Sequence, residues 1–90
     1  MSVFVLYHPD FLNHDTGVGH PENPDRLQAC VSALKSCEFS NQLNWKNPRF
    51  ALESELEWIH TKEHIQYIKS VCGSGGGYID PDTPVCSESY

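Results

Sequence analysis

The sequence predicts an α/β fold built around a mostly parallel sheet, of which this chain supplies only a part. A short apolar run at residues 3–7 is rich in β-branched and aromatic residues, which is typical of a strand buried on both faces. Amphipathic helices and a second short strand follow it, and this order indicates the opening of an α/β domain. Two short strands do not form a stable parallel sheet alone, so we expect a larger whole.

Length and composition set the class of protein. Ninety residues suffice for one small domain, 1–90, and only barely for a buried core. Hydrophobic residues make up 39% and charged residues 20%, which is typical of a globular chain. The net charge of −6 disfavours nucleic-acid binding. No apolar run approaches the ~20 residues of a membrane span, and we expect no signal peptide. The four cysteines form no CxxC pair, which favours reduced thiols in a cytoplasmic protein.

The first helix is predicted to begin at Pro24, after a loop over residues 11–22. Asn23 suits the N-cap, Pro24 the first helical position, and Asp25 complements the helix dipole. The apolar residues that follow at helical spacing are Leu27, Cys30, Val31, Leu34 and Cys37. The pattern therefore predicts an amphipathic helix of roughly fourteen residues.

The second half of the chain predicts shorter elements. We expect a strand around Leu43–Trp45 and a short acidic helix over residues 52–58. Thr61 is predicted to cap a further helix, whose inward side carries Ile65, Ile68 and Cys72. The glycine run at 73–77 ends this helix and predicts a flexible surface loop, since no Lys-Ser/Thr pair of a phosphate loop follows it. Residues 78–84, with two X-Pro steps, are expected to be irregular.

The segment 14–27 concentrates ionisable side chains between glycines and prolines, which fix an unusual backbone path. His14, Asp15 and His20 together suggest a metal site. Zinc needs three or four ligands converging at about 2 Å, and the glycines between these residues oppose that convergence. We therefore expect no metal ligands in this segment.

Two further histidines, His60 and His64, are four residues apart and fall on one helix face. The HExxH arrangement of a metalloprotease is absent, because Glu63 directly precedes the second histidine. Packing at the start of a helix is the favoured interpretation. A small metal-binding protein built on the five histidines stays open as a third interpretation of the chain.

Three stretches together resemble a known family. The pattern H-x5-H-P-E-x-P-x-R-L at residues 14–27, placed after a first strand, resembles the N-terminal signature of the histone deacetylase superfamily. That superfamily also includes acetylpolyamine amidohydrolases and acetoin-utilisation proteins. Residues 58–65 are similar to the stretch that leads into the family's next helix, and residues 80–84 are similar to its D-x-D-T loop.

The resemblance implies a three-layer α/β/α fold, similar to arginase, of which this chain is the N-terminal part. It also implies a zinc ion held by two aspartates and a histidine, which polarises an acetamide carbonyl and activates water. The implied substrate is acetyl-lysine or an acetylated polyamine. The family's zinc ligands and its histidine pair lie downstream of the matched stretch, and this chain contains no His-His pair and no DxH motif. We therefore expect no zinc binding and no hydrolysis by these ninety residues without the remainder of the deacetylase domain.

The resemblance also assigns roles to residues of this chain. An inner-channel or cavity-shaping role falls to Arg26, His20, Pro21 and Glu22. The rim of the substrate tunnel would include Phe11, Leu12, Asp80 and Asp82. The residues alone favour simpler explanations, namely an ion pair between Arg26 and Glu22 one helical turn earlier and a packed loop histidine at His20. No residue of this chain is expected to be catalytic.

A rival interpretation is a stand-alone, non-enzymatic interaction module that keeps the first layer of the deacetylase fold. Its missing sheet would then be supplied by a partner or by self-association. The coding sequence after Tyr90 separates the two interpretations. The deacetylase interpretation requires that it encode a His-His pair and an Asp-x-His motif.

Overall fold

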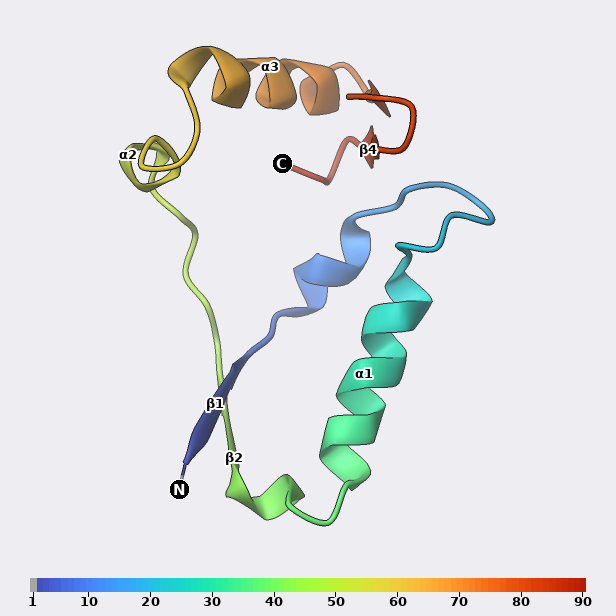
Figure 1. The fold of residues 1–90 in the computed structure, drawn as a ribbon, viewed down its shortest axis with the longest axis vertical. Helices are drawn as coiled ribbons and strands as arrows, with labels where there is room; N and C mark the ends of the chain where they lie inside the picture. Colours follow the sequence, from blue (N-terminus) through green and yellow to red (C-terminus); the bar gives the residue numbers. More distant parts are fainter. Residues whose placement is uncertain (1) are drawn as a thin grey trace.

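The computed structural model describes residues 2–90, which form a flattened body of 43 × 33 × 17 Å. One end carries a two-stranded sheet beside a long helix, and the other carries a helix and a hairpin (Figure 1). Strand β1 (Val3–Leu6) pairs in parallel with β2 (Leu43–Lys46), with Val3 opposite Leu43 and Leu6 opposite Lys46. Both predicted strands and their parallel pairing are therefore confirmed.

Helix α1 (Pro24–Ser36) connects the two strands and begins where the sequence predicts. The Asn23 side chain accepts a hydrogen bond from Arg26 N–H at 3.2 Å, and Pro24 occupies the first turn. This cap satisfies one of the backbone donors that a helix start leaves free. The cap therefore fixes both the start of α1 and the place of Arg26 on its first turn.

The stretch between β1 and α1 is more ordered than a plain loop. Residues Pro9–Asn13 form a 3-10 helix, η1, so the expectation of a loop from residue 11 onward is wrong for its first three residues. Asp10 N–H donates to the His8 imidazole at 3.1 Å, and Phe11 N–H donates to the His8 carbonyl at 3.0 Å. These two hydrogen bonds stabilise the first turn of η1. The segment has no apolar periodicity, so the sequence pattern did not predict this helix.

Helices α2 (Glu53–Leu56) and α3 (Lys62–Gly73) follow β2, after a second 3-10 turn, η2 (Ser40–Gln42). The acidic helix is shorter than the predicted 52–58. Thr61 caps α3 as predicted, since its hydroxyl accepts a hydrogen bond from His64 N–H at 3.1 Å. The inward side of α3 supplies the buried apolar side chains of the described residues, Ile65 and Cys72.

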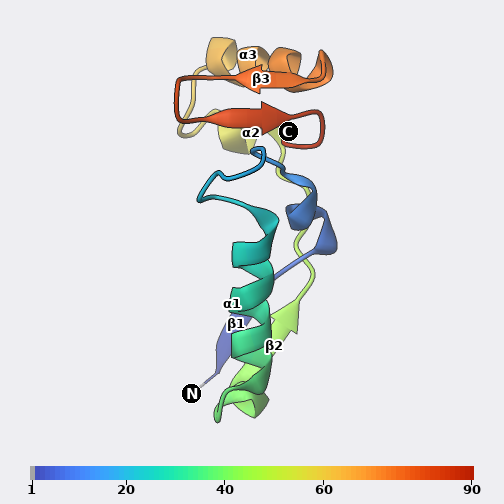
Figure 2. The same ribbon diagram turned by 90° about the vertical axis from the view of Figure 1, so that its right-hand side faces the viewer.

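The glycine run and the segment after it form a hairpin, which corrects two expectations. Strand β3 (Gly76–Tyr78) pairs antiparallel with β4 (Pro84–Cys86), so the expected loop at 73–77 is wrong at residues 76 and 77. The expected irregular stretch at 78–84 is wrong at its two ends, which are strand, whereas residues 79–83 between them form the turn of the hairpin. Gly76 has φ +104°, and a side chain there would meet Cys86 Cα at 2.8 Å. Glycine is thus required by close backbone approach within the hairpin. Figure 2 shows the hairpin lying against α3.

The first sheet is much more exposed than expected. Phe4 is 65% and Leu6 62% exposed, so the prediction of a strand buried on both faces is wrong within this chain. The apolar stripe of α1 likewise contains no buried residue. In residues 2–90 each strand of this sheet has one neighbour only. In the same residues, no helix is long and apolar enough to cross a membrane.

Candidate functional site

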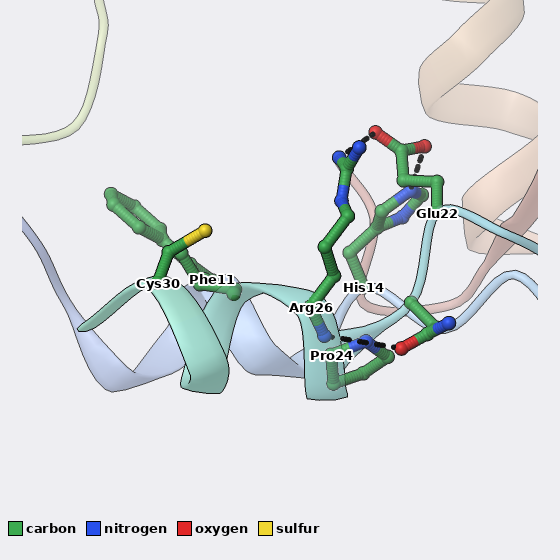
Figure 3. Close-up of a pocket in the computed structure, with 8 residues that line it drawn as sticks. Phe11, His14, Glu22, Pro24, Arg26 and Cys30 are labelled. Atoms are coloured by element: carbon green, nitrogen blue, oxygen red, sulfur yellow. Dashed lines mark hydrogen bonds and ion pairs between the residues drawn. The ribbon is translucent and has the colours of Figure 1, made fainter. Parts of the chain in front are cut away.

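A pocket of about 310 Å³ lies where η1 meets the first turns of α1 (Figure 3). Its lining residues are Phe11, His14, Glu22, Asn23, Pro24, Arg26, Leu27 and Cys30. One wall is apolar and carries an aromatic ring, whereas the other carries an arginine, a carboxylate and a histidine. The pocket therefore brings together Phe11 from the predicted rim with Glu22 and Arg26 from the predicted inner cavity.

Arg26 points along this polar wall and stays accessible. Its Nη2 lies 3.9 Å from Glu22 Oε1, and its side chain is 67% exposed. Figure 3 shows the guanidinium turned toward the Glu22 carboxylate. The ion pair that the residues alone favoured is present, and it leaves most of the Arg26 side chain exposed to solvent.

Every polar group of Glu22 has a partner. Its second carboxylate oxygen lies 3.5 Å from His14 Nε2, and its N–H donates to His20 Nδ1 at 3.1 Å. Its carbonyl accepts a hydrogen bond from the hydroxyl of Thr16, a buried polar residue. Glu22 thus joins both histidines of the opening loop to Arg26.

His20 extends from this loop to the C-terminal hairpin. Its Nε2 lies 3.2 Å from the Asp82 carbonyl and 3.5 Å from the Asp82 carboxylate. Because Nδ1 accepts from Glu22 N–H, the ring proton belongs on Nε2, which then donates to the Asp82 carbonyl. One predicted cavity residue and one predicted rim residue are therefore in direct contact.

The Asp80 side chain stabilises the turn formed by residues 80–83. Its carboxylate accepts hydrogen bonds from the Thr83 hydroxyl at 2.7 Å and from Asp82 N–H at 2.9 Å. These bonds, with that from Thr83 first, hold the pKa of the Asp80 carboxyl below its ordinary value. Its side chain therefore shapes the turn that carries Asp82, whose own side chain is 95% exposed.

The remaining predicted site residues do not meet the pocket. Leu12 is half-buried in η1 and Pro21 is exposed, and neither lines the cavity. Asp80 and Asp82 also lie outside its lining, although His20 connects Asp82 to the loop beside it. The structure thus gathers only part of each predicted group around one cavity.

His14 lines the pocket and Ser89 contacts His14 from the C-terminal segment, although sequence reasoning placed neither residue at the site. His14 Nδ1 lies 2.5 Å from Ser89 Oγ, which in turn accepts a hydrogen bond from Cys86 N–H at 2.8 Å. The two residues are 75 positions apart, so no local pattern predicts the contact. The sequence marked His14 as a candidate site residue only by its position in the ionisable segment, near the glycines.

Cys86 adds a thiol to the same junction. Its Sγ accepts from Asp15 N–H at 3.3 Å and donates to the Asn13 carbonyl at 3.2 Å. Partial burial raises the pKa of the thiol, but the Ser89 hydroxyl beside it and the N–H groups of Asp15 and Glu88, all of which can donate to a thiolate, outweigh that effect and lower it. The thiol thus ties the end of η1 to strand β4.

The side chains of residues 2–90 do not fit a zinc ion. No three of their histidine, cysteine, aspartate or glutamate side chains gather as a set of metal ligands. The rings of His60 and His64 lie 5.2 Å apart and tilted by 35°, beside an apolar hollow that includes Ile65 and Ile68. These two rings would need further ligands to hold a metal.

A comparison with protein families decides the identity of the chain. The family model described as the histone deacetylase domain matches residues 20–90. The chain belongs to the histone deacetylase family. The match confirms the resemblance seen in the ionisable segment, from residue 20 onward, and it extends through helices α1, α2 and α3 to the C-terminal hairpin.

Relatives of this deacetylase-family chain come from several kingdoms. An uncharacterised protein of Synechocystis, slr0245, is 36% identical over 98% of the chain, and a probable deacetylase of Methanothermobacter thermautotrophicus is 32% identical over 96%. The chain spans 30% and 25% of the length of these two relatives. It therefore corresponds to a portion of each.

A solved structure described as the HDA15 HD domain shares the fold. It superposes with a TM-score of 0.84 at 27% sequence identity, covering 99% of this chain and 27% of that one. The match confirms an α/β deacetylase fold that is incomplete in this chain and corresponds to its N-terminal portion.

Proposed function

We propose that residues 1–90 form the N-terminal part of a single deacetylase domain. The completed domain would hydrolyse the N-acetyl amide of acetyl-lysine or of an acetylated polyamine, and would release acetate and a free amine in the cytoplasm. Membership of the family supports this proposal, and so does the relative from Methanothermobacter, which is named a probable deacetylase.

The observation that carries the proposal is the pocket shared by Phe11, Glu22 and Arg26. A guanidinium presents several N–H donors in a plane and binds a carboxylate through two parallel hydrogen bonds. Arg26 keeps most of its surface exposed at the polar wall, so it is available to an acetate ion. We propose that Arg26 and the loop of His20, Pro21 and Glu22 shape the inner cavity through which acetate leaves.

The contact between His20 and Asp82 supports the proposed rim. It connects the loop beside the pocket with the turn at residues 80–83. We propose that this turn, with Phe11 and Leu12, borders the tunnel by which the acetylated substrate enters. The proposal gives these residues a shaping role and assigns none of them a chemical step.

Family membership implies zinc in the full-length enzymes, but the side chains described above do not fit the ion. We therefore propose that the ligands lie in the remainder of the domain, and that the ninety-residue chain does not hydrolyse acetyl groups alone. The uncovered apolar side chains of β1 support the view that such a remainder packs against this chain.

Co-expression tests the proposal. The chain is produced alone, and also together with the part of the Methanothermobacter relative that follows its own matching segment. We expect the chain alone to contain no stoichiometric zinc and to leave an acetyl-lysine peptide and acetylspermidine intact, whereas the complex hydrolyses one of them. Turnover with bound zinc in the isolated chain would contradict the proposed inactivity.

Two matched variants sharpen this test. Arg26→Gln is expected to lower kcat of the complex, whereas Lys62→Gln changes an exposed charge on α3 and is expected to leave kcat unchanged. A stable complex without hydrolysis would contradict the deacetylase proposal and favour the interaction module. Failure of the two parts to associate would contradict the view that this chain completes such a domain.

A further inference from the structure

We propose that His14 is a positioning residue that uses its two ring nitrogens for different tasks. Through Nε2 it holds the Glu22 carboxylate that faces Arg26, and through Nδ1 it holds Ser89 and thereby the C-terminal hairpin. The importance of this arrangement for a deacetylase rests on the proposed function, because that proposal makes Arg26 part of the inner cavity. The geometry itself stands on the contacts of the loop.

The partners of His14 determine which nitrogen carries the proton. The Glu22 carboxylate can only accept, so the nitrogen that faces it at 3.5 Å, Nε2, carries the hydrogen. Nδ1 is then an acceptor, and the Ser89 hydroxyl at 2.5 Å donates to it. Ser89 Oγ keeps a lone pair for Cys86 N–H, which donates at 2.8 Å. Each group in the series therefore has the role that its neighbour requires.

The series continues on the other side of Glu22. The carboxylate oxygen that does not face His14 lies 3.9 Å from Arg26 Nη2. Figure 3 shows the Glu22 carboxylate joined by dashed lines to the Arg26 guanidinium through one oxygen and to the His14 ring through the other. An exposed pair one helical turn apart holds an arginine weakly by itself. A second, less exposed contact that fixes the carboxylate reduces the freedom of the glutamate and so improves its hold on Arg26.

His14 is suited to this role because it is the less exposed member of its pair. The His14 side chain is 34% exposed, against 57% for Glu22. The backbone beside it is fastened independently, since Asp15 N–H and the Asn13 carbonyl both bind the Cys86 thiol. His14 thus stands on a segment that the hairpin already holds in place.

Nuclear magnetic resonance of the ninety-residue chain tests the proposal without any activity assay. In the unmodified chain we expect nuclear Overhauser effects between the His14 ring and the Ser89 β protons, and nitrogen shifts of an Nε2–H tautomer. Absence of the His14–Ser89 effects, or an Nδ1–H tautomer, would overturn the proposal. Neither result would bear on whether the completed domain hydrolyses acetyl groups.

Variants of His14 supply the second part of the test. His14→Phe keeps a planar ring without donor or acceptor, whereas His14→Gln restores one of each. We expect His14→Phe to speed hydrogen exchange at Cys86 N–H by about 2- to 10-fold, the effect of one lost hydrogen bond, and to increase the mobility of Arg26 Nε. His14→Gln is expected to recover both in part.

Two outcomes of these variants would contradict a positioning role. Unchanged Arg26 mobility in a folded His14→Phe chain would show that the histidine acts only by packing. Equal behaviour of the Phe and Gln variants would show the same. If His14→Phe does not fold, Arg26 mobility is measured in Glu22→Gln instead. This variant removes the charge of the carboxylate and so weakens its contacts with both His14 and Arg26. It must therefore increase the mobility of the Arg26 side chain.

Discussion

Arg49 and Glu55 form a two-point ion pair that joins the segment after β2 to helix α2. Arg49 Nη1 lies 2.7 Å from Glu55 Oε1, and Nη2 lies 2.6 Å from Oε2. Oε1 also accepts a hydrogen bond from Leu52 N–H at 2.8 Å, so the same carboxylate satisfies a free donor at the start of α2. A four-residue helix is held mainly by such end contacts, because it is too short to stabilise itself.

Acid is expected to break this pair. The hydrogen bonds from Arg49 and from Leu52 N–H lower the pKa of Glu55 from 4.5 to about 2. Because the folded-state pKa is depressed, the pair stabilises the fold above about pH 4.5 and loses this effect as the pH falls toward 2. Carboxyl-carbon resonance titration measures the Glu55 pKa. Arg49→Gln serves as the control and should return it toward 4.5, and an ordinary Glu55 titration in the unmodified chain would contradict the prediction.

Removal of the cap of α1 is expected to destabilise the loop and the helix together. Asn23→Ala loses the bond to Arg26 N–H and the bond from Asn23 Nδ2 to the His20 carbonyl. The expected loss is about 1 kcal/mol in the free energy of unfolding, measured by urea titration of helical circular dichroism. Asn23→Asp keeps the acceptor for Arg26 N–H and should lose less. Equal losses in both variants would show that the cap is not the cause.

Truncation of Ile65 is expected to affect the whole α3 end of the molecule. This side chain is 5% exposed, and Ile65→Ala leaves a cavity that typically costs about 2–5 kcal/mol. Val18→Ala is the matched control, because Val18 lies fully in solvent and its change should leave the free energy of unfolding nearly unaltered. Thermal unfolding of the two variants compares them. Similar melting temperatures would contradict the view that Ile65 belongs to the core.

The Cys86 thiol is expected to react at lower pH than an ordinary cysteine. Burial raises its pKa, but the Ser89 hydroxyl and the N–H groups of Asp15 and Glu88 favour the thiolate and give a net lowering, so the thiolate forms earlier as the pH rises. The hydroxyl has a single proton, which turns from His14 Nδ1 to the sulfur when the thiolate forms. Mass spectrometry of iodoacetamide labelling against pH measures the profile site by site. Ser89→Ala should move the Cys86 profile to higher pH. A profile that does not respond to Ser89→Ala would show that this hydrogen bond does not control the thiol.

Local chemistry made much of the fold predictable. Asn23 and Thr61 marked the starts of both long helices, because an N-cap acts on donors only two or three residues away. The parallel relation of β1 and β2 followed from the helix between them. These features depend on neighbours in sequence or on short connections, which a single chain displays.

Features that depend on distant partners were not predictable. Strand β3 contains two glycines, which have low strand propensity, and it exists because β4 pairs with it. The burial of β1 was overestimated because its composition reflects a larger sheet than these residues supply. At the site, Arg26 and Glu22 could be paired from their spacing, whereas the contact of His14 with Ser89 had no local signal.

The contacts from the opening loop to the hairpin also set an order for folding during synthesis. Helices α1 and α3 need only their own residues, so they are free to form while the chain is still emerging from the ribosome. His20 must wait for Asp82 and His14 for Ser89, which lie 62 and 75 residues later. A stop codon in place of Asp82 would therefore remove both contacts and leave the loop beside Arg26 unfastened, although every residue of that loop would be intact.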